Sequence, residues 1–75
     1  MPPSRQAIER VQVASERMRQ AHNDHLAFIE RPDRTFSLDE RAENERLLTA
    51  LRQSIEEYWD AFSAAVAEDL AARQG

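Results

Sequence analysis

The residues of this sequence best suited to chemistry form the cluster His22-Asn23-Asp24-His25. Histidines three positions apart share one face of a helix, so both imidazoles could bind one metal ion. A hairpin would bring Glu45 near them, and two histidines with a carboxylate suit zinc. The alternative interpretation is a polar layer within an apolar stripe, in which the imidazoles bond Glu45, Asn44 or water. We favour the polar layer and expect neither a metal nor a cofactor, with His22, His25 and Glu45 as the residual metal candidates.

No other pattern in the sequence indicates catalysis. The serines do not lie in the glycine-flanked turns of a nucleophile, and a phosphate loop is excluded because the only glycine is Gly75. The acidic pairs Glu56-Glu57 and Glu68-Asp69 are adjacent, so their carboxylates diverge around a helix. We therefore expect no catalytic residues and no enzyme activity. The two histidines leave open a pH-sensitive assembly, because an imidazole gains charge near pH ~6.5.

Length and composition predict one small all-α domain that needs help to complete its core. The chain has 75 residues, 41% of them hydrophobic and 32% charged, with one glycine and no cysteine. A domain of this size buries little apolar surface, and disulfides cannot contribute without cysteine. Self-association is therefore the leading source of additional stability.

The charge distribution argues against a nucleic-acid partner. Six arginines and five acidic residues lie in residues 1–35, whereas four arginines and nine acidic residues follow. Nucleic-acid phosphates would be repelled by the acidic second half. The sequence also contains no apolar run long enough for a membrane span and no signal-peptide pattern. We expect a cytoplasmic protein that binds neither nucleic acid nor membrane.

Start and stop signals divide the chain, residues 1–75, into a single hairpin of two helices. Ser4 is a suitable N-cap for a first helix over about residues 5–30, and Pro32 favours a loop over 31–36. Ser37 and Glu40 form a capping box that starts a second helix over about 38–73. We expect Phe36 to act as an N-terminal staple or a lid over Ile29 and Leu38.

Unequal helix lengths and broad apolar stripes predict assembly into a four-helix bundle, most simply as a homodimer. A short loop requires antiparallel helices, and the longer second helix then leaves its end without a partner. Two helices bury only part of each other's surface. In a monomer we therefore expect solvent exposure of Leu47, Leu51, Tyr58 and Phe62. The residues predicted to form the oligomer interface are Val11, Met18, Leu48, Leu51, Ile55, Tyr58, Phe62 and Val66.

These features favour a small protein–protein interaction module, such as an adaptor, chaperone or inhibitor, that works as a coiled-coil homo-oligomer. Tyr58, Trp59 and Phe62 occupy about one helical turn, and aromatic residues often anchor interfaces. Trp59 and Leu70 are the candidate contacts to another protein. Two alternatives remain: a metal-binding bundle that uses His22 and His25, and a structural component of a larger helical assembly.

Overall fold

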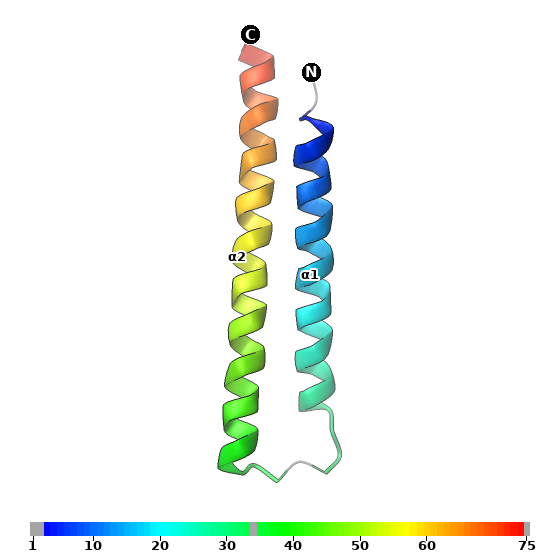
Figure 1. Cartoon of the computed structure of the whole chain (residues 1–75), viewed down its shortest axis with the longest axis vertical. Coiled ribbons are helices and arrows are strands. Elements are labelled where there is room, and N and C mark those ends of the chain that lie inside the picture. Colours follow the sequence, from blue (N-terminus) through cyan, green and yellow to red (C-terminus); the bar gives the residue numbers. More distant parts are fainter. Residues whose placement is uncertain (1–2, 34, 75) are drawn as a thin grey trace.

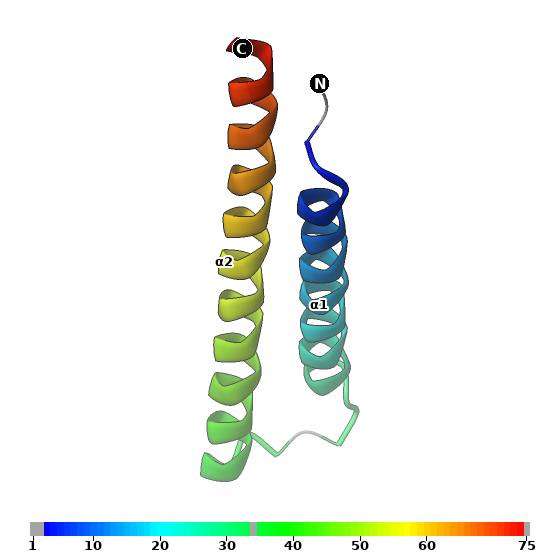
Figure 2. The same cartoon turned by 45° about the horizontal axis from the view of Figure 1, so that its top comes forward.

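The computed structural model describes residues 3–33 and 35–74 and consists of two antiparallel α-helices joined by a loop (Figure 1). Helix α1 spans Arg5–Ile29 and α2 spans Leu38–Gln74. Both views place the helices side by side, with the loop at one end and the two termini at the other (Figures 1 and 2). The extents are 58 × 16 × 13 Å, so the predicted all-α hairpin is confirmed as a long, thin molecule. Neither described helix has an apolar stretch long enough to cross a membrane.

The first helix begins at the predicted N-cap. The Ser4 hydroxyl accepts a hydrogen bond from the Ala7 N–H at 3.1 Å, which satisfies one of the free donors of the first turn. Ser4 also donates its own N–H and its hydroxyl to the Glu68 carboxylate, at 3.1 and 3.0 Å. The cap therefore ties the start of α1 to α2. At the other end the Glu30 N–H donates to the Leu26 carbonyl, and the chain leaves the helix before Pro32.

The loop is closed by the carboxylate of Glu40. As the capping box predicts, the Glu40 N–H donates to the Ser37 hydroxyl at 3.2 Å. The Glu40 carboxylate reaches further back than a capping box requires, and accepts from the N–H groups of Thr35 and Phe36 at 3.0 and 2.8 Å. It also pairs with Arg31 at 3.0 Å, and the Glu40 side chain is only 12% exposed. One side chain thus holds both sides of the connection.

The expectation that Phe36 covers Ile29 and Leu38 is wrong. Phe36 is 77% exposed and Leu38 is 82% exposed. The Phe36 backbone has a φ of +56°, in the left-handed region that bulky residues avoid. This conformation is held by the hydrogen bond from the Phe36 N–H to Glu40, so the backbone contact takes precedence over burial of the ring.

The two helices meet along a seam whose positions alternate at spacings of three and four residues, the pattern of a coiled coil. The seam residues of α1 are Ala7, Val11, Ala14, Met18, Ala21, His25 and Phe28, and those of α2 are Asn44, Leu47, Leu51, Ser54, Tyr58, Ala61 and Ala65. All are buried or half-buried. Small residues recur every seven positions on both sides, which allows the helix backbones to approach closely but buries little apolar surface.

Leu47 corrects one of the sequence-based expectations. The sequence predicts that Leu47 is exposed to solvent in a single chain. In the structure it is buried, with 9% of its surface exposed. Leu47 is seven residues before Ser54 and so occupies the seam, where it lines the same groove as Phe28 of α1. Even so, no large side chain among the described residues is fully buried. The seam alone is therefore a thin core.

The Glu40 contacts predict a stability effect that ordinary helix capping does not provide. Glu40→Ala should lower the free energy of unfolding by about 2 kcal/mol, because three charge-assisted hydrogen bonds in the loop are lost. Urea denaturation at fixed protein concentration measures this loss. Asp39→Ala is the matched control, since it removes a carboxylate from the same first turn and should cost about 0.5 kcal/mol. Equal losses for the two variants would contradict the loop-closing role.

Candidate functional site

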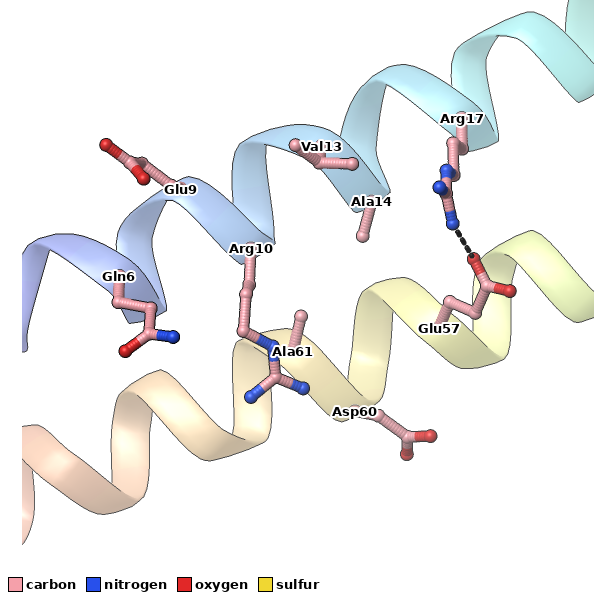
Figure 3. A pocket seen from close by; sticks show the side chains of 9 residues that line it. All are labelled: Gln6, Glu9, Arg10, Val13, Ala14, Arg17, Glu57, Asp60 and Ala61. Carbon is pink, nitrogen blue, oxygen red and sulfur yellow. Dashed lines mark ion pairs between the residues drawn. The ribbon is translucent and has the colours of Figure 1, made fainter.

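One long side of the hairpin is charged, and Figure 3 shows the groove between the helices on that side. Arg17 of α1 pairs with Glu57 of α2 across the groove at 3.6 Å, and both side chains are more than half exposed. Glu9 of α1 and Asp60 of α2 lie at the two rims of the groove, and their carboxylates point outward in opposite directions (Figure 3). The residues lining it are Gln6, Glu9, Arg10, Val13, Ala14, Arg17, Glu57, Asp60 and Ala61. The carboxylates therefore do not converge on a point where a substrate could be held by both.

Ion pairs continue along this charged side toward the loop. Arg46 donates from Nε to a Glu43 carboxylate oxygen at 2.9 Å. This hydrogen bond lowers the pKa of the Glu43 carboxyl below its ordinary value and raises the pKa of the Arg46 guanidinium. Both groups line a groove next to Arg17 and Asp24. The ion pairs of Arg17 with Glu57 and of Arg46 with Glu43 thus form within one chain, and their side chains are partly exposed to water.

The opposite side of the hairpin is apolar. A groove between the helices there is lined by Ser15, Met18, Arg19, His22, Leu51 and Ile55. Residues at seven-residue spacing from these, together with Val66 one helical turn after Phe62, extend the surface in both directions along the helices. We define the apolar face as Ile8, Val11, Ser15, Met18, His22 and Ile29 of α1 with Leu48, Leu51, Ile55, Tyr58, Phe62 and Val66 of α2. Ile8, Ile29, Phe62 and Val66 expose 42, 39, 41 and 41% of their surfaces.

Of the residues predicted for an oligomer interface, Val11, Met18, Leu51 and Tyr58 belong to the seam between the two helices, and Leu48, Ile55, Phe62 and Val66 lie beside it on the apolar face. The half-buried ones are Val11, Met18, Leu48, Leu51, Ile55 and Tyr58, and the exposed ones are Phe62 and Val66. The sequence-based set omitted Ile8 and Ile29, which flank the seam at the two ends of α1. Their spacing of seven residues from Ser15 and His22 could have identified them, because these four positions follow one line along a supercoiled helix.

Trp59 lies at the edge of the apolar face and contacts two other aromatic rings. Its ring meets those of Tyr58 and Phe62 edge-on, with centroids 5.7 and 5.9 Å apart. Tyr58 and Phe62 are stacked on each other at 6.1 Å. Trp59 nevertheless exposes 57% of its surface. Leu70, which lies further toward the C-terminal end of α2, exposes 52% of its surface. The two candidate partner contacts are therefore both accessible in the single chain.

The two histidines have different surroundings. His25 lies in the seam, with its Nε2 2.9 Å from the Asn44 side-chain oxygen, a distance that fits an Nε2–H donating to the amide. His22 is exposed and lines the apolar groove. Glu45 pairs with Arg41 at 3.6 Å. Within residues 3–33 and 35–74, no group of three His, Cys, Asp or Glu side chains has the arrangement of a metal site.

Neither a known protein family, nor a curated protein sequence, nor a solved structure shows a significant match to this chain.

The contact between His25 and Asn44 predicts a measurable coupling. A double-mutant cycle with His25→Ala and Asn44→Ala should give a coupling energy of about 1 kcal/mol in urea denaturation, the usual contribution of a part-buried hydrogen bond. The neighbouring, exposed Asn23 offers a control, because Asn23→Ala should change stability by less than about 0.5 kcal/mol. Strictly additive effects of the two seam substitutions would show that the pair does not stabilise the hairpin.

Proposed function

We propose that this protein is a non-enzymatic protein–protein interaction module that works as a homodimer. The apolar face of one hairpin packs on the same face of a second copy, and the two hairpins form a four-helix bundle. The observation that carries this proposal is the apolar groove between the helices, flanked along both of them by exposed Ile8, Ile29, Phe62 and Val66. Apolar surface that follows two helices in register is typical of a layer within a bundle.

The exposed area of the chain supports an interface of normal size. A compact monomer of 8.7 kDa exposes about 4,700 Å² by the general scaling of surface with mass. This chain exposes 5900 Å². The excess of roughly 1,200 Å² is larger than the roughly 800 Å² that each partner buries in a standard protein–protein interface. A dimer that buries roughly 1,200 Å² of each chain would leave each chain exposing about as much surface as a compact monomer of its mass.

A second copy fits this face better than a single foreign helix. The face follows two antiparallel helices of a molecule 58 Å long, and a second hairpin has the same length and the same two-helix width. A lone helix would cover the central groove but leave the outer flanks of α1 or α2 in water. Two-fold homodimers are also the commonest closed assemblies, since one surface serves both partners.

After dimerisation the outer surface of α2 remains available to a different protein. Trp59 and Leu70 lie at the edge and on the outside of this helix, and both are more than half exposed. Glu56 lies one helical turn before Trp59 and is exposed, and no salt bridge joins it to a residue in the described part of the chain. This chemistry suits a partner that offers an apolar pocket with a basic rim. An adaptor, chaperone or inhibitor would use such a contact.

The contacts of the polar residues favour this function over a metal-binding bundle. His25 is hydrogen-bonded to Asn44, Glu45 is paired with Arg41, and His22 is exposed at the apolar groove. A zinc site would require His25 and Glu45 to leave their present partners and to converge with His22. Protein assembly requires no such rearrangement.

The central test is a charge placed on the apolar face. Phe62→Asp should convert a dimer into a monomer, because the new carboxylate would be buried without a partner in the interface. Helicity should also fall, since the aromatic contacts of Phe62 within α2 are lost. Sedimentation equilibrium gives the mass and circular dichroism gives the helicity.

The adjacent substitution Ser63→Asp is the matched control, because Ser63 is exposed and lies one residue further around α2, away from the face. It should leave the dimer intact. A wild-type protein that sediments as a compact, fully helical monomer at micromolar concentration would overturn the proposed function.

A further inference from the structure

We propose that the two copies pack in opposite directions, so that their loops lie at opposite ends of the bundle. This inference rests on the proposed homodimer and specifies its geometry. The two-fold axis would run across the helices at the level of Met18 and Ile55, the middle of the apolar groove. The argument comes from two lines of residues on the apolar side, one on each helix.

The line on α2 is complementary to itself when it is reversed. It contains Arg41, Leu48, Ile55, Phe62 and Asp69, at intervals of seven residues. If two such lines run antiparallel about Ile55, each Ile55 meets its copy and Leu48 meets Phe62. At the two ends, Arg41 of one chain meets Asp69 of the other. Apolar residues then face apolar residues, and the only two charges of the line are opposite in sign.

The line on α1 has the same property. It contains Ile8, Ser15, His22 and Ile29, again at intervals of seven. Antiparallel pairing about the midpoint of this line places Ile8 against Ile29 of the second copy. It also places Ser15 against His22, so that a hydroxyl and an imidazole form a hydrogen-bonded pair inside an otherwise apolar interface. The two polar residues thus satisfy each other.

A single two-fold axis can serve both lines, because their centres lie at one level of the hairpin. The centre of the α1 line falls beside Met18, and the centre of the α2 line is Ile55. Both residues line the same groove. At this level the ion pair of Arg17 with Glu57 also bridges the helices, at 3.6 Å. One two-fold axis can therefore pass through the centres of both lines without a shift of one helix along the other.

The alternative dimer, with both loops at one end, pairs the lines poorly. There the α2 line of one copy packs on the α1 line of the other, which brings Leu48 to His22, Ile55 to Ser15 and Arg41 to Ile29. Each of these contacts buries a polar group against an apolar one, which is unfavourable without a compensating hydrogen bond. The opposite orientation avoids all three mismatches.

The charged side chains around the apolar face are compatible with the proposed geometry. Arg41 pairs with Glu45 at 3.6 Å, and Asp69 pairs with Arg73 at 3.0 Å. When the two ends meet, these pairs combine into a network of alternating charges. Arg19 lies near the axis at the edge of the groove, and its pairing with Glu16 at 3.7 Å compensates its charge there.

Spin labels on single cysteines test the orientation, because the native sequence contains no cysteine. Asp33→Cys places a label in the exposed loop, and Gln74→Cys places one at the far end of α2. In the proposed dimer, two Asp33→Cys labels should be more than about 40 Å apart, given the rise of a helix along the bundle. A mixed dimer of one Asp33→Cys chain and one Gln74→Cys chain should bring its labels within about 25 Å. Pulsed electron spin resonance measures both distances.

The outcomes separate this inference from the proposed function. A long distance between loop labels together with a short one in the mixed dimer supports the opposed orientation. A dimer with loop labels within about 25 Å overturns the orientation but leaves the homodimer standing. A monomeric mass at the same concentration overturns both. Circular dichroism of each labelled chain should match that of the wild type, since both sites are exposed.

Discussion

The close approach of α1 and α2 along a seam of small residues is the constraint on which the rest of this molecule depends. Ala7 and Ala14 of α1 and Ser54 and Ala61 of α2 are all at most 7% exposed. Small side chains at seven-residue spacing let two backbones lie close together, but they contribute little apolar area to the core. Several larger apolar residues lie beside the seam instead of within it. Ile8, Leu48, Ile55 and Phe62 lie on one side of it, and this placement supports the proposed dimer.

The two sides of the hairpin differ in polarity: one carries exposed ion pairs and the other carries exposed apolar side chains. On the charged side, Arg17 with Glu57 and Arg46 with Glu43 form exposed ion pairs, which solvent screens and which contribute little to stability. That side is complete in a single chain. On the apolar side, covering Ile55 and Phe62 removes hydrocarbon from water, at roughly 25 cal/mol per Å². The proposed assembly would therefore gain its free energy from the apolar side, while the charged side stays hydrated.

The sequence predicted the helices well because local signals control their ends. Ser4 and Pro32 act on the backbone within a turn or two, and such short-range effects can be recognised without knowledge of the tertiary structure. The seam was harder to place. Leu47 and Leu48 are adjacent and equally apolar, and only the position of α1 decides that Leu47 is buried in the seam while Leu48 flanks it. The loop contacts of Glu40 likewise depend on how the chain reverses, which helical spacing does not encode.

The polar residues within the apolar regions serve specificity more than stability. A seam of alanine and leucine alone would tolerate slippage by one heptad, whereas the bond between His25 and Asn44 is satisfied in only one register. In the proposed dimer, Ser15 and His22 would act in the same way between chains, because they can satisfy each other in only one orientation. The cluster that first suggested metal chemistry thus contains one histidine, His25, that bonds across the two helices of a single chain. Its other histidine, His22, would align two chains only in the proposed dimer.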